Sequence, residues 1–511
     1  MPIDPANHST SPYTRPAFAL LFLGAILRVA SYFFSQNSGG DAAERLTLTA
    51  RWLQHPGFNL IFHLYPPGHF WLMAALATVT PNVVVAGRLL SLLLGIASVF
   101  VVWRLARLLY GEAAGMLSLA VFAFYSMQIG YSTTSSSEVP CVFFLLVALF
   151  FFFFYFHEGS DRLRYLAVSG IALSISGAIR VEAWIVFGEL FLLLAWLLLR
   201  GSIKPSLRSI FPPLLVFGVT GGAWPAVLMT YCWRAFGDPI YLVTQNHLRV
   251  LKTLSMVPAP WTARLAHIPG VLLLALSPLA FVAAIYGLVK SRRLPLGAGF
   301  AGVAFFFWAI QSYEILRGGL LGLARYTLIL GTMLAVISGY GLEQICARWF
   351  PRKVALAQTV AILLLFVSLV GVLVLSETHN HFADTFAPIS PRLRHAGRVS
   401  SVATYLRAHM GPQDAVVVDN YNVESNIIID AAGLPLLYGK RAYLESASND
   451  IEVREYIRTE HPRFLVYSDQ GTLRETFALP RDCSQAADID GIHFQCGFAN
   501  QIYRVYELSY P

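Results

Sequence analysis

The sequence carries little charge, since only 13% of its 511 residues are Asp, Glu, Lys or Arg. This is about half the share found in soluble globular proteins. Hydrophobic residues make up 56% of the chain, and its mean hydropathy is +0.58. The apolar residues gather in runs of about 20, the length needed to cross the hydrocarbon core of a bilayer. An ordinary soluble protein is therefore excluded, and the chain is predicted to be a polytopic α-helical membrane protein.

Cysteine is also scarce, with five residues in the whole chain. Cys141, Cys232 and Cys346 lie in or beside apolar runs, where cysteine usually serves as an inert small residue. Cys483 and Cys496 both lie in the polar C-terminal tail. If this tail is extracytoplasmic, its compartment permits disulfides, so this pair is the candidate for a bridge.

Several functional motifs are missing as well. No internal repeat is visible, which counts against the inverted-repeat plan of many transporters. The outer-loop histidines lack an H-x-x-x-H spacing, so they are interpreted as surface or substrate-contact residues, and metal binding by them is a minor alternative. They are His55, His63, His69, His247 and His267. The net charge of +8 is what Lys- and Arg-rich cytoplasmic loops produce, and it does not indicate a nucleic-acid partner.

Eleven apolar stretches have the composition of membrane spans. They cover residues 17–34, 83–103, 112–128, 139–156, 165–179, 183–199, 210–230, 268–289, 296–311, 326–345 and 354–375. Alternate loops are rich in Arg and Lys, which places these loops and the N-terminus in the cytoplasm. We therefore expect a plasma (inner) membrane protein with an extracytoplasmic tail. Arg28 interrupts the first run, and it is expected to face the bundle interior because a charge facing lipid is costly.

The tail differs in composition from the rest of the chain. The change near residue 376 predicts a membrane domain, 1–375, followed by a C-terminal domain, 376–511. In the tail, VATYLRAH and DIEVREYIRTEH predict helices, whereas AVVVD, RFLVYS and QIYRVYEL predict strands. This alternation is typical of a small α/β layer structure. The tail has no glycine-rich phosphate loop and no catalytic constellation, so a docking or lid role is favoured.

The stretch DAAERLTLTARWLQ follows the first span and predicts a helix along the membrane surface. Asp41 and Glu44 have the spacing of a capping box at its start. A capping acid keeps a free carboxylate oxygen and is held ionised by the helix dipole. Asp41 is therefore either a cap alone, or also a general base or metal ligand at the outer membrane face.

Other charged residues stand at the ends of spans on the same side. Glu138 follows three serines, Arg180 and Glu182 separate two spans in AIRVEAW, and Arg325 begins ARYTLIL. Each alone fits a helix start or an anchor to lipid headgroups. Together with Asp41 they predict a polar cavity at the outer face, where an arginine can bind phosphate as a bidentate fork.

The order of these motifs resembles the GT-C superfamily of polytopic glycosyltransferases, in particular the protein-mannosyltransferase, aminoarabinose-transferase and RgtA/B/C/D-like group. The similar stretches are GGDAAERL, YPPG, SSSEVP, IRVEAW and ARYTLIL, within about residues 17–345. The resemblance implies that Asp41 is catalytic. The family often has a basic residue before the paired prolines, where this sequence has Tyr65. The phosphate contact is therefore expected elsewhere, at Arg180, Arg325, or Arg249 and Lys252 of a basic outer loop.

The resemblance implies that a hexosyl or pentosyl group is moved from a polyprenyl-phosphate donor to a lipid, glycan or protein acceptor, with inversion. Asp41 would take the acceptor proton, and arginine or a divalent metal, Mg²⁺ or Mn²⁺, would stabilise the leaving phosphate. The expected substrate-contact residues are Tyr65, Glu138, Arg180, Glu182, Arg249, Lys252, Arg325 and Tyr326. The alternatives are a transporter or flippase of a lipid-linked substrate and a non-catalytic assembly subunit. A transporter would need ionisable groups near mid-membrane, whereas most of those here lie at one face.

Overall fold

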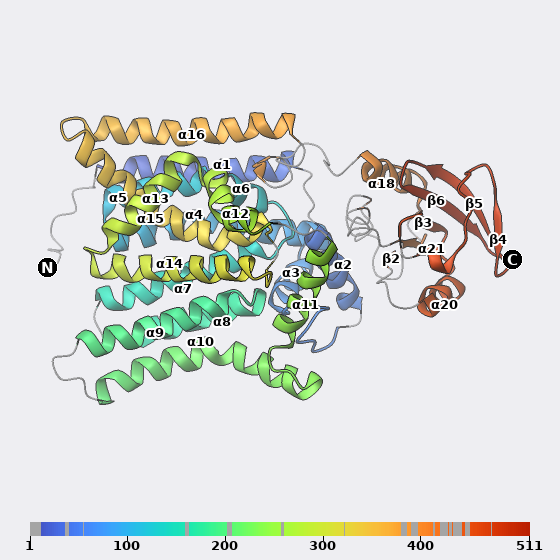
Figure 1. The fold of residues 1–511 in the computed structure, drawn as a ribbon, viewed down its shortest axis with the longest axis horizontal. Coiled ribbons are helices and arrows are strands. Elements are labelled where there is room, and N and C mark those ends of the chain that lie inside the picture. Colours follow the sequence, from blue (N-terminus) through green and yellow to red (C-terminus); the bar gives the residue numbers. More distant parts are fainter. Residues whose placement is uncertain are drawn as a thin grey trace.

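The structure is a computed structural model, and it consists of a long helical bundle followed by a small sheet domain (Figure 1). It describes residues 12–35, 40–54, 56–158, 163–201, 207–256, 260–320, 322–379, 386–389, 397–411, 414–419, 428, 432, 442–444, 450–471 and 473–511. The protein is an integral membrane protein with a C-terminal α/β sheet domain, as its sequence predicted.

The bundle is formed by apolar helices, the long ones of which run roughly parallel to one another (Figure 1). They are α1 (Thr14–Phe34), α4 (Val83–Tyr110), α5 (Glu112–Ala123), α6 (Ser126–Tyr131), α7 (Glu138–Glu158), α8 (Leu163–Ile179), α9 (Ala183–Gly201), α10 (Leu207–Phe236), α12 (Trp261–Leu276), α13 (Pro278–Ser291), α14 (Pro295–Leu316), α15 (Leu328–Trp349) and α16 (Val354–Thr378). Three further helices, α2 (Gly40–Gln54), α3 (Gly68–Ala77) and α11 (Tyr241–Met256), lie at the end of the bundle that faces the sheet domain.

The number of spans differs in part from the eleven expected. Among the described residues, eight helices are long and apolar enough to cross a membrane, or nine if α12 and α13 form one span. Two expected spans coincide instead with the shorter helices α5 and α8. The span expected at 268–289 is broken into α12 and α13, with a bend of 116° between them. Ser277 at this bend has a φ of 89°, and Pro278 has no N–H to continue the ladder of α12.

The centre of the bundle is the span Ala324–Trp349, which consists of the turn before α15 and α15 itself. In the most apolar 18 residues of this span, 83% are buried, against 17% in the corresponding part of α10 at the periphery. Arg28 is fully buried, and its Nη1 donates to the Gly24 carbonyl at 3.0 Å. The expected inward orientation of Arg28 is therefore confirmed. The central position of α15 also means that residues at its start are held by dense packing.

The C-terminal domain contains a six-stranded sheet in the order β2-β1-β3-β6-β5-β4. The strands are β1 (Val416–Val418), β2 (Ala442–Leu444), β3 (Phe464–Ser468), β4 (Ala487–Ile489), β5 (Ile492–Ala499) and β6 (Tyr503–Ser509). The pairs β1–β2 and β1–β3 are parallel, whereas β3–β6, β6–β5 and β5–β4 are antiparallel. The expected α/β layer structure is thus confirmed.

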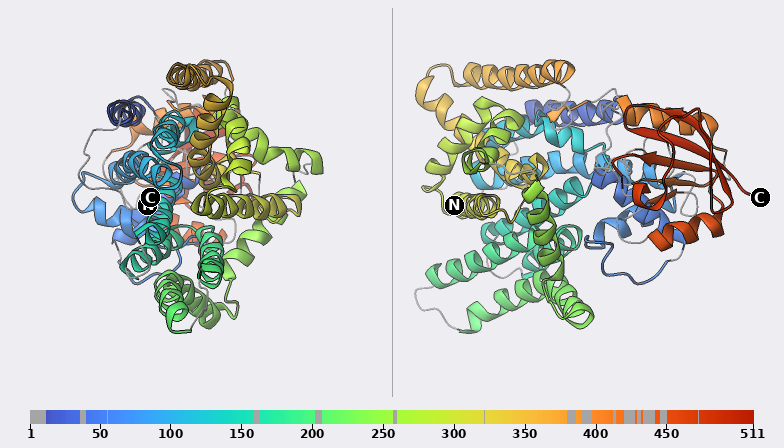
Figure 2. Two further views of the ribbon diagram at one scale, coloured as in Figure 1. Left: turned by 90° about the vertical axis from the view of Figure 1, so that its left-hand side faces the viewer. Right: turned by 45° about the vertical axis from the view of Figure 1, so that its right-hand side comes forward.

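Both faces of this sheet are covered by helices (Figure 2). Val402 and Leu406 of α18 (Gly397–His409) pack with Val416 on one face. Val453 of α20 (Asp450–Glu460) and Leu473 of α21 (Leu473–Thr476) share a cluster on the other. The alternation of buried residues along the strands explains why each face finds a partner layer.

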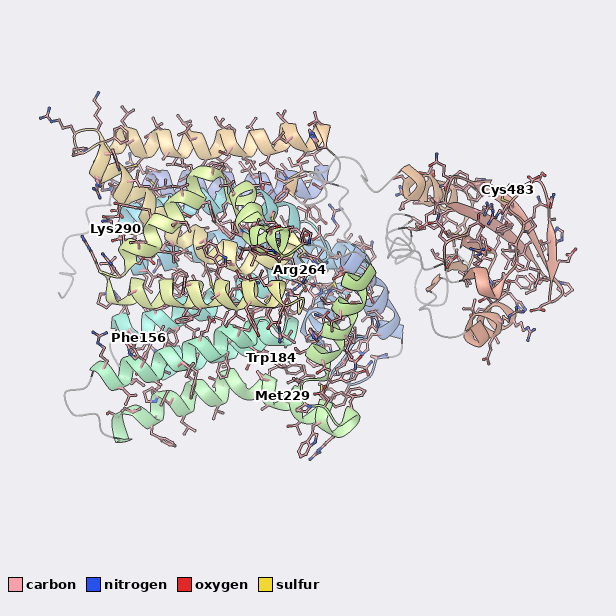
Figure 3. The ribbon with its side chains drawn as sticks, in the orientation of Figure 1. Phe156, Trp184, Met229, Arg264, Lys290 and Cys483 are labelled. Atoms are coloured by element: carbon pink, nitrogen blue, oxygen red, sulfur yellow. A yellow bond between two sulfur atoms is a disulfide. The ribbon has the colours of Figure 1, made fainter. Side chains whose placement is uncertain are left out.

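Cys483 and Cys496 are joined by a disulfide, whereas Cys141, Cys232 and Cys346 are free and buried. Figure 3 places Cys483 in the sheet domain and Lys290, an expected cytoplasmic residue, at the far end of the bundle. The two lie at opposite ends of the molecule (Figure 3). The expected topology requires this, because it places Lys290 in the cytoplasm and the tail outside.

Candidate active site

Asp41 lies in the first turn of α2, with 34% of its side chain exposed, and its Oδ2 is 2.7 Å from Nη2 of Arg325. The capping box expected here is not formed. Helix α2 already begins at Gly40, and Glu44 binds His63 Nδ1 at 2.8 Å and the Tyr65 hydroxyl at 2.7 Å. The loop that follows α2 therefore folds back onto Glu44, and Asp41 is left to face Arg325.

Arg325 comes from the 3₁₀ turn η1 (Ala324–Thr327), which leads directly into the central helix α15. Besides Asp41, it approaches Glu138, with 3.8 Å between Arg325 Nε and Glu138 Oε1. Its side chain is 19% exposed. Two acids that start different helices thus meet one guanidinium that is fixed to the core of the bundle.

Arg180 lies between two further carboxylates at the end of α8. Its Nη1 is 2.7 Å from Glu138 Oε1, and its Nη2 is 2.5 Å from Glu182 Oε1. Nη1 also donates to the Ser137 hydroxyl at 3.2 Å. The side chain of Arg180 is 10% exposed, and its charge is therefore matched by acids in a largely dry environment.

Burial alone would lower the pKa of Arg180, but the charges of Glu182 and Glu138 outweigh it and raise that pKa well above its ordinary value. The guanidiniums of Arg180 and Arg325 both lie near the Tyr326 ring, 5.5 and 5.4 Å from its centroid. This arrangement, with three carboxylates to two guanidiniums, carries one excess negative charge.

A small pocket opens at this arrangement. Its lining residues are Glu138, Arg180, Glu182, Arg325, Tyr326, Leu328 and Ile329. The five residues Asp41, Glu138, Arg180, Glu182 and Arg325, here called the ionic cluster, are thus brought together from four separate segments. The sequence predicted that these residues share one side of the membrane domain, and the structure places them in contact.

Tyr65 lies beside the ionic cluster, close enough for the charge of Asp41 to act on it, and it contacts Glu44. Burial comes first among the causes that raise the pKa of the Tyr65 hydroxyl, followed by the charges of Asp41 and Glu44. The hydroxyl therefore stays protonated and donates to Glu44. Burial would also raise the pKa of Glu44, but hydrogen bonds from His63 and Tyr65 outweigh it, and the pKa is lowered.

Three further polar residues lie near the ionic cluster, and two of them, Arg45 and Arg88, were not singled out from the sequence. Arg45 follows Asp41 by one turn of α2, and its guanidinium lies 4.0 Å from the centroid of the Tyr65 ring. His69 of α3 is fully buried, and neither of its ring nitrogens has a hydrogen-bond partner. Helical spacing from Asp41 could have identified Arg45. His69 was expected to be a surface or substrate-contact residue, and its burial excludes the surface position.

Arg88, on α4, is the third. It donates to the carbonyls of Tyr32 at 2.6 Å, Ser35 at 3.0 Å and Thr133 at 2.9 Å. These carbonyls end α1 and precede α7, so Arg88 joins the two segments that lead to Asp41 and Glu138. A charge inside an apolar run is the signal that could have identified it.

Arg249 and Lys252 lie on α11, but their side chains are outside the part of the chain that the structure describes. Within that part, no group of three or more His, Cys, Asp or Glu side chains is placed to hold a metal ion. The acids of the ionic cluster instead face guanidiniums, which a divalent cation would have to displace. The described residues of this site therefore do not fit Mg²⁺ or Mn²⁺.

The family model of dolichyl-phosphate-mannose-protein mannosyltransferases matches residues 65–228. This match covers about a third of the chain; it begins at Tyr65 and so leaves out Asp41. No curated protein matches the chain significantly.

The fold is similar to that of ArnT from Cupriavidus metallidurans in the apo state, with a TM-score of 0.63, 10% identity, and coverage of 97% of this chain and 98% of that one. The same protein bound to undecaprenyl phosphate gives a TM-score of 0.61 at 11% identity, over 96% and 98% of the two chains. The oligosaccharyltransferase AglB from Archaeoglobus fulgidus, in complex with an inhibitory peptide and a dolichol-phosphate, gives 0.53 at 12% identity, over 90% and 70%. The resemblance to GT-C glycosyltransferases expected from the sequence is thereby confirmed, and at these identities the solved structures establish a shared fold.

Proposed function

We propose that the chain is an inverting glycosyltransferase that moves a hexosyl or pentosyl group from a polyprenyl-phosphate donor to a lipid, glycan or protein acceptor. The observation that carries this proposal is the 2.7 Å contact between Asp41 and Arg325 beside the pocket. It sets a carboxylate that can accept a proton next to a guanidinium that can stabilise a departing anion.

In the proposed reaction, Asp41 takes the proton of the acceptor hydroxyl as that oxygen attacks the anomeric carbon of the sugar. The bond between this carbon and the phosphate oxygen breaks, and the polyprenyl phosphate leaves with the electron pair. Because attack and departure occur on opposite sides of the carbon, its configuration inverts. Arg325 stabilises the negative charge that develops on the phosphate.

The remaining members of the ionic cluster support Arg325 in this proposal. Glu138 is shared between Arg180 and Arg325, and Arg180 is matched by Glu138 and Glu182. A guanidinium matched by two carboxylates gains less from a phosphate than one with a single strong partner. We therefore place Arg325 at the phosphate, while the contact of Arg180 with the donor, expected from the sequence, stays a prediction.

The comparisons favour the same donor class. ArnT has been solved with undecaprenyl phosphate and AglB with a dolichol-phosphate. The description of the matching family model names dolichyl-phosphate mannose. We further propose that the N-terminus is cytoplasmic in the inner membrane. The ionic cluster and the C-terminal domain, 376–511, are then extracytoplasmic, and the donor tail lies among the spans.

The proposal is tested with the full chain in lipid nanodiscs and a panel of polyprenyl-phosphate sugars. Release of polyprenyl phosphate together with a glycosylated acceptor supports it, and divalent-metal chelation with EDTA in the same assay tests the metal alternative. The broken span α12–α13 is a feature that the transporter alternative predicts. Translocation of a labelled lipid-linked sugar across vesicles, without any transfer in this panel, would favour that alternative.

A further inference from the structure

Six basic side chains lie at the end of the bundle that points away from the sheet domain. They belong to the last residues of α13 and α15 and to the turns that follow these helices. The six, here called the basic turn pair, are Lys290, Arg292, Arg293, Arg348, Arg352 and Lys353. Figure 3 shows Lys290 at this end, far from Cys483 in the sheet domain.

The two turns are neighbours because α13 and α15 pack closely and run in the same direction. The Ser338 hydroxyl of α15 donates to the Ala280 carbonyl of α13 at 2.9 Å. Three residues further along both helices, Gly341 leaves no room for a Cβ against the Ala283 carbonyl. The two helices therefore advance together and bring their final turns side by side.

Tyr286, in the second half of α13, is where the two turns meet. Lys290 Nζ lies 5.3 Å from the centroid of the Tyr286 ring, and the charges of Lys290 and Arg348 both act on the Tyr286 hydroxyl. The turn after α15 is closed by a hydrogen bond of 2.9 Å from the Lys353 N–H to the Phe350 carbonyl. Two cations from different turns thus lie around one hydroxyl.

The charges of the basic turn pair are not matched by acids. Among the described residues none of the six forms an ion pair, whereas Arg107, at the same end of the bundle, is 2.5 Å from Glu112. Glu343 of α15 is partly buried, and its charge acts on the Tyr340 hydroxyl together with that of Arg293. Neighbouring cations without counter-charges repel one another, and an anionic ligand would relieve this repulsion.

Apolar side chains continue from the basic turn pair along the outside of the bundle. Trp349 and Phe350, at the end of α15, are 70% and 54% exposed, as is usual for aromatic residues at a membrane interface. Helices α13 and α16 are neighbours. Their exposed apolar side chains include Val282, Ile285, Val289, Leu356 and Val360. A cationic end on an apolar surface fits a lipid, with its phosphate at the turns and its acyl chains along the helices.

We infer that the basic turn pair is a binding site for the headgroup of an anionic phospholipid. Lys290 and Arg348 hold the phosphate, the Tyr286 hydroxyl donates to it, and the remaining cations attract it at longer range. Arg325 and this site lie at opposite ends of the span Ala324–Trp349, so the inference does not depend on the sugar transfer proposed above. In the proposed orientation the site faces the cytoplasmic leaflet, whose surface is anionic.

The test measures lipid binding to the full chain in a neutral detergent by native mass spectrometry. The probes are phosphatidylglycerol, phosphatidylcholine, which has a phosphate but no net charge, and glycerol 3-phosphate, which has no acyl chains. Lys290→Gln/Arg348→Gln should weaken phosphatidylglycerol binding about 10- to 30-fold, because each basic residue contributes about fivefold at an anionic lipid. Phosphatidylcholine binding should not change.

Two further variants make the test specific. Arg352→Gln/Lys353→Gln removes two exposed cations of the same turn pair, and it should weaken phosphatidylglycerol less than the first variant does. Arg104→Gln/Arg200→Gln is the matched control. It removes two arginines near the ends of α4 and α9, at the same end of the bundle, each of which lies over a single aromatic ring. The control should bind phosphatidylglycerol like the wild type.

An equal loss of affinity in the control and in the first variant would overturn the inference, because it would show a general attraction to basic surface. Phosphatidylcholine binding as tightly as phosphatidylglycerol would also overturn it, as would equally strong binding of glycerol 3-phosphate. If the first variant melts below the wild type, Arg352→Gln/Lys353→Gln decides, and its unchanged affinity would refute the site. Sugar transfer without selective lipid binding refutes only this site, whereas selective binding without transfer refutes only the proposed function.

Discussion

The carboxylate of Asp41 and the guanidinium of Arg325 meet at 2.7 Å, although one begins the surface helix α2 and the other begins the central helix α15. This contact joins a helix outside the bundle to the most deeply buried of the candidate spans. Because the contact with Arg325 is made by Oδ2 of Asp41, the other carboxylate oxygen is left to take a substrate proton. The pair therefore unites the base and the anion-stabilising group of the proposed reaction.

Asp41→Asn should reduce sugar transfer by about 10²–10⁴-fold, the usual contribution of a general base. Asn is nearly isosteric and is tolerated in the first turn of a helix, so the variant should fold and insert as the wild type does. The measurement is the initial rate of transfer in nanodiscs, with undecaprenyl phosphate binding as a check on folding. Asp238→Asn, at the turn between α10 and α11, is the matched control and should be fully active. Near-normal turnover of Asp41→Asn would remove Asp41 from the chemistry.

Arg325→Gln should lower the turnover number more than it weakens donor binding. The lost interaction grows as charge develops on the phosphate, and a hydrogen bond to a charged group contributes about 1.5–3 kcal/mol. Arg325→Lys should recover only part of the rate, because an ammonium cannot reproduce the fork. Separate determination of kcat and KM decides the point. A variant with a raised KM and unchanged kcat would make Arg325 a binding residue only.

Arg180→Ala should lower the stability of the protein as well as its affinity for the donor. Removing this guanidinium leaves Glu138 and Glu182 in a largely buried site without their partner, and breaking a buried ion pair in this way costs about 3–5 kcal/mol. Thermal unfolding in detergent gives the stability, and undecaprenyl phosphate binding gives the affinity. If stability stays at the wild-type level while binding falls at least tenfold, Arg180 contacts the donor directly, as its sequence position suggested.

The stability that Glu44 contributes should depend on pH. Hydrogen bonds from His63 and Tyr65 outweigh burial and lower its pKa from the ordinary 4.5. A lowered folded-state pKa means that the contribution is present above pH 4.5 and is lost as the pH falls through the folded value. Glu44→Gln should therefore have a lower melting temperature than the wild type at pH 7, and the difference should shrink below pH 4.5. A constant difference across this range would show that the charge of Glu44 does not contribute.

The members of the ionic cluster could be predicted because membrane topology restricts them. Charged residues at the ends of apolar spans on one side must lie at similar depth, so Asp41, Glu138, Arg180 and Arg325 could be grouped before any contact was known. Their pairing could not be predicted in the same way. It depends on the rotation of each helix about its axis, which is set by packing along the whole bundle.

Other features depended on tertiary structure for different reasons. The spacing of Asp41 and Glu44 fits a capping box, but the hairpin-like return of the chain to Tyr65 gives Glu44 other partners. The break at Ser277 is invisible to hydropathy, because both α12 and α13 are apolar. Arg45 forms no close ion pair among the described residues, although Asp41 and Glu138 attract it at longer range, and its position on α2 does not reveal this.

The extracytoplasmic position of the tail should be visible in its cysteines. Cys483 and Cys496 are bridged, and the three free cysteines are buried within the bundle. Disulfides persist in extracytoplasmic compartments, and the short loop closed by this bridge limits its stabilisation to about 3 kcal/mol. A membrane-impermeant thiol reagent applied to cells with a permeabilised outer barrier should therefore label the tail only after reduction.

The Cys483→Ser/Cys496→Ser variant is the control, and it should stay unlabelled under both conditions. Labelling without reduction would remove the bridge but keep the tail outside. Labelling that also requires rupture of the inner membrane would place the tail, and with it Asp41, on the cytoplasmic side, where the proposed use of an outward-facing lipid-linked donor would fail.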